Sequence, residues 1–99
     1  MRFEFHPEAL AEYEDAARYY AGCQKGLELR FIAAVEHVIQ QIIESSERWP
    51  VLEEDIRRCL TRVFPYAVLY SVDYILIISL MHSHREPGYW RKRIANPAN

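Results

Sequence analysis

The stretch YAVLYSVDYILIISLMH, residues 66–82, decides the fold because its apolar side chains recur with a period of two residues. In its first part, Tyr66, Val68 and Tyr70 point to one side of an extended chain and the residues between them point to the other. Residues 75–82 are almost wholly apolar, which is typical of a central strand covered on both faces. The residues between these two parts leave room for a tight turn, so we predict an antiparallel hairpin.

Two further strands are expected earlier in the chain. Residues 55–62 mix basic and apolar side chains directly before the hairpin, and a strand there would make three antiparallel strands in the second half of the chain. Near the N-terminus, Phe3 and Phe5 alternate with polar residues, which predicts a brief strand. Pro7 ends that strand and suits the first turn of a helix.

Two amphipathic helices are predicted between the brief strand and the rest of the sheet. Residues 7–21 carry apolar side chains at three- and four-residue spacing, with acidic residues toward the N-terminal end. A longer helix follows Gly26, ends near residue 44 or 46 and has a broader apolar stripe. Because only a few residues join them, we expect an antiparallel helical hairpin whose common face lies on a sheet.

The expected fold is therefore α+β, with a small antiparallel sheet packed by an N-terminal α-helical hairpin. The predicted element order is β-α-α-β-β-β, followed by a short C-terminal helix that begins after Pro87 and ends before Pro97. With 99 residues, 51% of them hydrophobic, the chain has enough apolar surface for one core and too little length for two. We expect a single domain that spans residues 1–99.

The composition also indicates where the protein works. No apolar run approaches the roughly 20 residues that a membrane-spanning helix needs, so we expect no membrane association. The N-terminus lacks the apolar core of a signal peptide, and Cys23 and Cys59 are far apart in the sequence. We therefore expect free thiols and a location in the reducing cytoplasm.

The net charge of −2 conceals an uneven distribution along the chain. Residues 1–56 hold five Lys or Arg and twelve Asp or Glu, a net charge of −7, whereas residues 57–99 hold seven and two, a net charge of +5. The predicted helices are acidic, and the predicted sheet and C-terminus are basic. A basic face of this kind suits a nucleic acid or an acidic protein as its partner.

Several residues of the basic half could carry chemistry. Arg58 and Arg62 share a face of a regular strand, and Arg57 points the opposite way, so the first two could bind phosphates or carboxylates. A solvated strand face paired with the acidic helices explains the same pattern equally well. His84 and Arg85 follow the long apolar strand, where an imidazole could act as acid or base and the guanidinium could stabilise a phosphorane.

The C-terminal aromatic residues and the paired histidines have structural explanations as well. Trp90 is expected to anchor the terminal helix on the core, whereas the role of Tyr89 stays open between stacking on a base and packing. His82 and His84 could face one way, but zinc needs more ligands than this segment offers, so we expect no metal. No phosphate-binding glycine loop is present, and we expect no cofactor.

These segments together resemble the RelE/ParE superfamily of toxins from bacterial type II toxin–antitoxin systems, and in particular its ParE-like branch. The resemblance extends over nearly the whole chain. It rests on the order and spacing of residues 12–20, 26–31, 64–70 and 82–90 and on Arg93. The fold of that superfamily is a small antiparallel sheet packed by a helical hairpin, which agrees with the prediction from periodicity.

The resemblance implies two activities on one scaffold. RelE-like members cleave mRNA in the ribosome without a metal, and ParE-like members inhibit DNA gyrase. Arg85 falls where RelE-like enzymes keep an arginine, Arg58 and Arg62 lie in the region of their basic strand, and Tyr89 lies near their tyrosine position. Leu60 and Ala67 replace further basic groups, and a phosphoryl-transfer site needs such cations.

The resemblance therefore favours a toxin that binds a protein, with DNA gyrase as target, a role in plasmid stabilisation and a cognate antitoxin as partner. The alternative is a ribosome-dependent endoribonuclease in which Arg58, Arg62, His84, Arg85 and Tyr89 are catalytic. A second alternative is an inactive or regulatory member of the family. We expect the antitoxin to cover apolar residues left exposed along the helical hairpin and the sheet edge.

Overall fold

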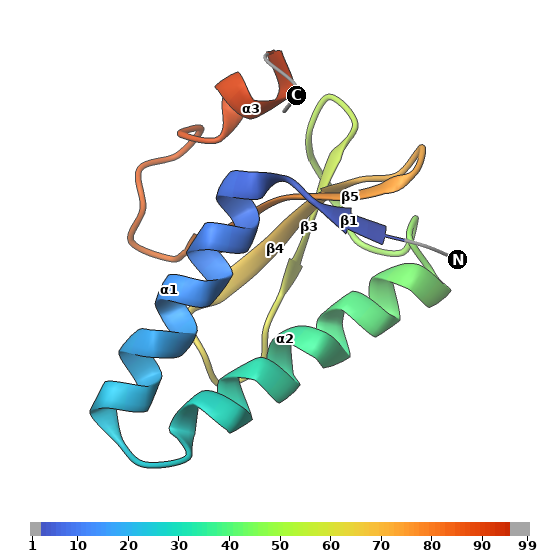
Figure 1. The fold of residues 1–99 in the computed structure, drawn as a ribbon. Coiled ribbons are helices and arrows are strands. Elements are labelled where there is room, and N and C mark those ends of the chain that lie inside the picture. Colours follow the sequence, from blue (N-terminus) through green and yellow to red (C-terminus); the bar gives the residue numbers. More distant parts are fainter. Residues whose placement is uncertain (1–2, 96–99) are drawn as a thin grey trace.

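A computed structural model describes residues 3–95 and contains one sheet, a helical hairpin and a short C-terminal helix (Figure 1). The predicted α+β fold is confirmed. In chain order the elements are β1 (Phe3–Phe5), α1 (Pro7–Cys23), α2 (Leu27–Glu44), β2 (Val51–Glu53), β3 (Ile56–Leu60), β4 (Tyr66–Ser71), β5 (Ile75–His82) and α3 (Arg91–Ala95). None of the helices in the described part of the chain is long and apolar enough to cross a membrane.

The sheet has five strands in the order β1-β5-β4-β3-β2. It differs from the predicted sheet in two details. Strand β2 is an additional edge strand that pairs antiparallel with β3, and β1 pairs parallel with β5, so the sheet is mixed. A parallel pair needs a long crossover between its strands, and most of the chain, including the helical hairpin, lies between β1 and β5.

Both helices of the hairpin begin at residues that suit a helix N-terminus. At α1, the Nδ1 atom of His6 accepts a hydrogen bond from the backbone N–H of Glu8 at 3.1 Å, and Pro7 occupies the first helical turn. Gly26 has a φ of 85°, a left-handed conformation that glycine adopts without strain, and it turns the chain into α2. The helical hairpin then lies across one face of the sheet (Figure 1).

The core has two parts, one on each face of the sheet. The part under the helical hairpin includes Phe31 and Ile42 from α2 and Val68 and Ile77 from the sheet. The part on the opposite face is formed by Ile56, Ala67, Leu69, Ile78 and Trp90. Strand β5 is thus covered on both faces, as predicted, and Trp90, only 1% exposed, anchors the C-terminal segment as expected.

The register between β4 and β5 shifts once, next to Ser79. Leu69 pairs with Ser79, but Tyr70 pairs with Ile77, so Ile78 is an extra residue in β5. Ile78 packs with Trp90 on the face opposite the helical hairpin. The fully buried Ser79 hydroxyl bonds to Glu12 of α1 and Tyr89 of the C-terminal segment.

Candidate functional site

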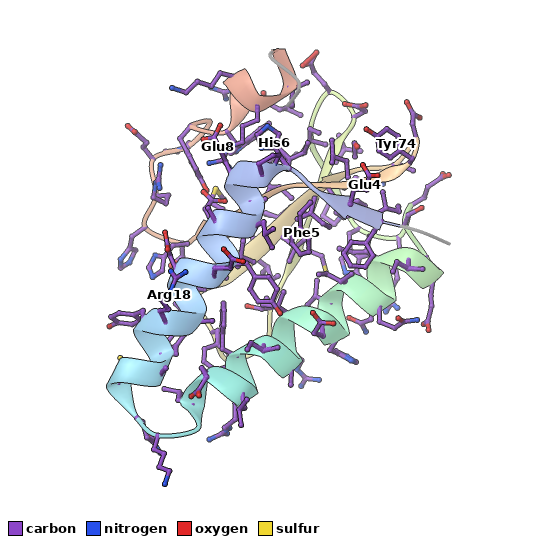
Figure 2. All side chains as sticks on the ribbon, viewed as in Figure 1. Glu4, Phe5, His6, Glu8, Arg18 and Tyr74 are labelled. Carbon is purple, nitrogen blue, oxygen red and sulfur yellow. The ribbon has the colours of Figure 1, made fainter. Side chains whose placement is uncertain are left out.

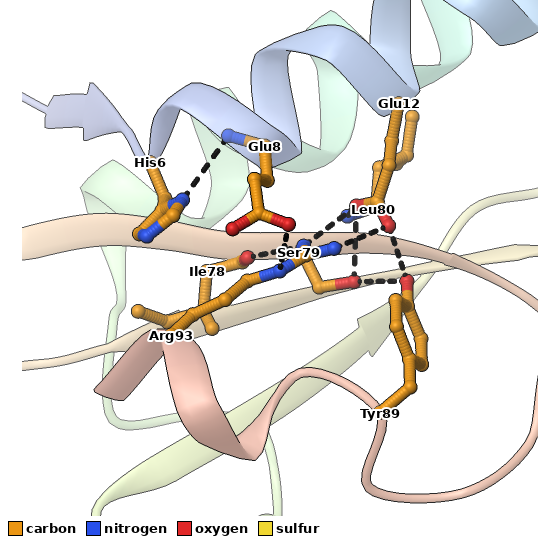
Figure 3. A network of polar contacts seen from close by, with 8 residues as sticks. All are labelled: His6, Glu8, Glu12, Ile78, Ser79, Leu80, Tyr89 and Arg93. Carbon is orange, nitrogen blue, oxygen red and sulfur yellow. Dashed lines mark hydrogen bonds and ion pairs between the residues drawn. The ribbon is translucent and has the colours of Figure 1, made fainter. Parts of the chain in front are cut away.

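A polar network around the Glu12 carboxylate joins α1, β5 and the C-terminal segment (Figure 3). The carboxylate accepts hydrogen bonds from the Tyr89 hydroxyl at 2.6 Å, from the backbone N–H of Leu80 at 3.0 Å and from the Ser79 hydroxyl at 3.2 Å. The Arg93 guanidinium donates to it twice, through Nη1 at 3.0 Å and Nη2 at 2.9 Å. We call Glu12, Ser79, Leu80, Tyr89 and Arg93 the Glu12 network.

The charges in the Glu12 network are balanced internally. Burial alone would raise the pKa of Glu12, but the hydrogen bonds from Arg93, Tyr89 and Leu80 and the charge of Arg93 lower it below its ordinary value. Burial alone would lower the pKa of Arg93, but Glu12 raises it. The Arg93 side chain is 6% exposed, donates to the carbonyl of Ile78 at 3.0 Å and lies 3.7 Å from the carboxylate of Glu8. Both groups are ionised at neutral pH, and their interaction ties α3 to α1.

Tyr89 is held as a neutral hydrogen-bond donor. Burial and, as a smaller cause, the hydrogen bond to Glu12 raise the pKa of Tyr89 to about 12. Its hydroxyl also lies 2.6 Å from the Ser79 hydroxyl, and its ring is flanked by two guanidinium groups, with Cζ of Arg85 at 3.8 Å and Cζ of Arg93 at 5.0 Å from the centroid. A phenol in this environment does not act as a base at neutral pH.

Two shallow pockets bring some of the predicted site residues together. A pocket of about 240 Å³ is lined by both Arg85 and Tyr89, with Tyr19, Tyr66 and His82 at its sides. A pocket of about 210 Å³ on the sheet face opposite the helical hairpin is lined by Arg58 and Arg85, together with Met81, Trp90 and Arg91. We call the second the arginine pocket. Arg85 therefore lines both pockets.

Arg62 and His84 line neither pocket. Strand β3 ends at Leu60, and Arg62 is an exposed residue of the connection to β4. The prediction that Arg62 shares a strand face with Arg58 was therefore wrong, because alternation of side chains applies only within a strand. Arg57 lies on the side of the helical hairpin, where its Nη1 donates to the carbonyls of Trp49 at 2.7 Å and Glu47 at 3.1 Å. It therefore holds the connection between α2 and β2.

The two histidines at the end of β5 contact each other. Their ring centroids are 5.3 Å apart, and the backbone N–H of His84 donates to Nδ1 of His82 at 3.0 Å. His84 is exposed, and His82 packs edge-on against Tyr66. Within residues 3–95 no group of three His, Cys, Asp or Glu side chains is placed to hold a metal ion.

The two positions where a basic group would be expected differ in their surroundings. Leu60 is 65% exposed on β3, whereas Ala67 is 4% exposed and packs in the core beside Trp90. A long cation at position 67 would therefore need a different packing of this face. Leu60 instead presents an apolar side chain to solvent beside Arg58 and the apolar residues that line the same hollow, Phe64 and Met81.

Sequence reasoning missed two residues of the Glu12 network. Glu12 reads as one of several acidic residues on α1, and Ser79 reads as a small residue in an apolar strand. The available signal was the serine itself, because a hydroxyl in a strand buried on both faces requires a partner. Its partners, Glu12 and Tyr89, come from sequence positions 67 residues before and 10 residues after it.

Comparison with known proteins identifies the family. The family model described as ParE toxin of type II toxin-antitoxin system, parDE, matches residues 3–87. Among solved structures, the chain is similar to one titled "Chromosomal ParDE TA system from P. aeruginosa", with a TM-score of 0.69 and 13% sequence identity over 83% of this chain and 95% of that chain. No curated protein matches. The structural likeness supports the fold, and the family match covers most of the sequence, so this chain belongs to the ParE toxin family of type II toxin–antitoxin systems.

Proposed function

We propose that this ParE-family toxin acts by binding a protein target, DNA gyrase, in the cytoplasm and that a cognate antitoxin neutralises it. The observation that carries the proposal is that Tyr89 is a neutral hydrogen-bond donor, which argues against RNA cleavage. Its hydroxyl donates to the Glu12 carboxylate at 2.6 Å and burial raises its pKa, so it is unsuited to remove a proton from a ribose hydroxyl. Arg93 is likewise committed to Glu12 and cannot stabilise a phosphorane.

The exposed surface near Arg58 supports a protein target. Leu60 is 65% exposed and Val63 is 91% exposed, and both lie near Arg58 in sequence and on the same end of β3. Exposed apolar side chains beside an arginine suit a protein interface, where arginine is enriched. A nucleic-acid surface would favour further cations at these positions.

The uncovered apolar residues of the helical hairpin and the sheet edge support an antitoxin partner. Leu10 on α1 is 40% exposed, and Leu29 on α2 is 65% exposed. On the edge strand β2, Val51 is 50% and Leu52 is 39% exposed. An edge strand also has unpaired backbone groups on its outer side, which an extended antitoxin segment could pair with.

A supercoiling assay tests the proposed target. Purified toxin should inhibit DNA gyrase in the absence of ribosomes, and the Tyr89→Phe variant should retain the inhibition because the hydroxyl serves only the fold. Addition of the protein encoded beside the toxin gene should restore supercoiling. Normal supercoiling at toxin concentrations that arrest growth would contradict the proposal, and the absence of any growth arrest would indicate the regulatory alternative.

Cleavage of mRNA is the second candidate, because Arg58 and Arg85 line the same pocket. Two guanidinium groups in one pocket can bind a phosphate and stabilise its transition state. Primer extension on mRNA isolated after induction would reveal ribosome-dependent cuts. If the toxin cleaves RNA, Arg85→Ala should abolish the cuts, whereas a growth arrest without cuts would exclude this candidate.

A further inference from the structure

We propose that Glu53 is a specificity-determining residue, which engages Arg91 and thereby lowers the affinity of the arginine pocket for nucleic acids. This inference rests on the proposed function, in which the partner of the toxin is a protein and not RNA. The arginine pocket is lined by Arg58, Arg85 and Arg91, and Glu53 is the one carboxylate among the described residues that line it. A carboxylate inside a cluster of guanidinium groups affects which anions that cluster binds.

The strand pairing places Glu53 on the same face of the sheet as the arginine pocket. Glu53 pairs with Ile56 across β2 and β3, and the side chains of directly paired residues lie on one face. Ile56 packs with Trp90 on the face opposite the helical hairpin. Arg58, two residues further along β3, points to that same face. The fold of the β2–β3 hairpin thus brings the Glu53 carboxylate among the guanidinium groups.

Glu53 and Arg91 form a bidentate ion pair. Nε of Arg91 donates to one carboxylate oxygen of Glu53 at 2.8 Å, and Nη2 donates to the other oxygen at 2.9 Å. These hydrogen bonds hold the pKa of Glu53 below its ordinary value, so the carboxylate is charged at neutral pH. The edge of Arg91 that would bind a phosphate bidentately is therefore already occupied.

The backbone of Gly88 provides the space for this ion pair. Gly88 has a φ of 79°, a left-handed conformation that favours glycine. The guanidinium of Arg91 lies so close to Gly88 that a Cβ there would overlap with Nη1 and lie 2.5 Å from Cζ. A side chain at position 88 would push the guanidinium away, so the loop before α3 is shaped to accommodate Arg91 in this position.

The two other arginines of the pocket stay available to an acidic protein. Arg58 and Arg85 are exposed, and neither forms an ion pair with any residue from 3 to 95. A single acidic side chain needs one or two guanidinium groups, whereas a nucleic acid gains affinity with each further cation that contacts its backbone. The pairing of Arg91 with Glu53 therefore weakens binding of nucleic acid more than binding of an acidic protein.

A second arginine of the C-terminal segment is neutralised in the same way. Arg91 and Arg93 belong to the basic run that follows Tyr89 and Trp90, and basic residues beside aromatic ones suit single-stranded nucleic acid. Arg93 pairs with Glu12 as Arg91 pairs with Glu53. Both carboxylates come from the acidic half of the sequence, which thus removes two cations from this run.

Fluorescence anisotropy of a labelled oligouridine with the full chain tests the proposal. The wild type should bind this RNA weakly, and Glu53→Gln, which releases Arg91, should raise the affinity by roughly fivefold. The affinity of the variant should also depend more steeply on salt. One further phosphate contact adds about 0.7 to the slope of log affinity against log salt concentration for a single strand.

Two control variants separate the ion pair from net charge. Glu4→Gln makes the same change in net charge on β1, at the opposite edge of the sheet from β2 (Figure 2), and should change the affinity by less than about twofold. Glu53→Gln with Arg91→Ala should return the affinity to the wild-type value, because the released guanidinium is absent. Urea denaturation should give nearly the same midpoint for the wild type and Glu53→Gln, since an exposed ion pair contributes little to stability.

The proposal is overturned if Glu4→Gln raises the affinity as much as Glu53→Gln does, or if the gain persists without Arg91. Tight binding of oligouridine by the wild type would also overturn it and would support the RNA-cleavage candidate. Gyrase inhibition enters none of these measurements. A toxin that shows the expected RNA affinities but leaves gyrase active would therefore contradict only the proposed target.

Discussion

Glu12 is the residue that connects the C-terminal segment to the helical hairpin. Its carboxylate accepts the hydrogen bonds of Tyr89, Leu80 and Arg93, and the Arg93 side chain is 6% exposed. Glu12→Gln leaves that buried guanidinium without its main counter-charge, and we expect the free energy of unfolding to fall by about 3 kcal/mol. Urea denaturation measures the change. Glu14→Gln, which alters an exposed carboxylate of the same helix, should change it by less than about 0.5 kcal/mol.

The pH dependence of stability provides a separate test of Glu12. Because its pKa is lowered in the folded state, its contribution to stability is complete well above the ordinary value of 4.5 and is lost as the pH falls through the folded-state pKa. The difference in unfolding free energy between the wild type and Glu12→Gln should therefore be constant near pH 7 and narrow below about pH 4.5. A difference that stays constant down to the acid limit would mean that Glu12 is not ionised in the fold.

Val63 stores backbone strain at the tip of the connection between β3 and β4. Its φ is 76°, a left-handed conformation that a β-branched residue adopts only with strain, and its side chain is 91% exposed. Val63→Asn relieves the strain without removing a buried contact, and we expect it to raise the free energy of unfolding by about 1 kcal/mol. Thermal and urea denaturation check this. If Val63 also contacts the target, the same variant should inhibit gyrase less while it unfolds less readily.

At the scale of elements, the C-terminal segment is fixed to the sheet by Trp90. The indole is 1% exposed and packs with Ile56, Leu69 and Ile78 on the face opposite the helical hairpin. Trp90→Ala should lower the free energy of unfolding by about 3–5 kcal/mol because it leaves a cavity in this smaller core. Trp90→Phe should recover much of that loss. Relative to the wild type, Trp90→Ala should accelerate hydrogen exchange more in α3 than in α2. An equal change in both helices would contradict this role.

The elements differ in how far the sequence predicts them. The helical hairpin, β4 and β5 follow from local periodicity, since each has enough residues to display a pattern. Strands β1 and β2 have three residues each, and nothing local indicates that Phe3 lies beside Ile75 in a parallel pair. The Glu12 network was equally hidden, because its members lie up to 81 residues apart in the sequence. Trp90 could be predicted as an anchor because a large aromatic side chain beside a terminal helix buries much apolar surface when it packs on the core.

At the scale of the whole molecule, the uneven charge along the sequence separates basic from acidic side chains across the sheet. The basic residues Arg58 and Arg85 line the arginine pocket, and Arg91 lies there in a bidentate ion pair with Glu53 at 2.8 and 2.9 Å. The exposed carboxylates Glu4, Asp55 and Asp73 lie on β1 and on the turns at the other end of the sheet. One small domain thus presents basic and acidic side chains toward opposite ends of its sheet.

The arginine pocket should therefore control association with the target through charge. Arg58 and Arg85 are both exposed, and neither forms an ion pair within residues 3–95. Arg58→Glu with Arg85→Glu should weaken target binding more than about tenfold and reduce its salt dependence, because attraction becomes repulsion. The matched control, Arg18→Glu with Arg30→Glu, makes the same change in net charge on the helical hairpin. Affinity measured at several salt concentrations separates the two pairs. If both double variants weaken binding equally, the net charge of the molecule controls association, and the arginine pocket is not the contact surface.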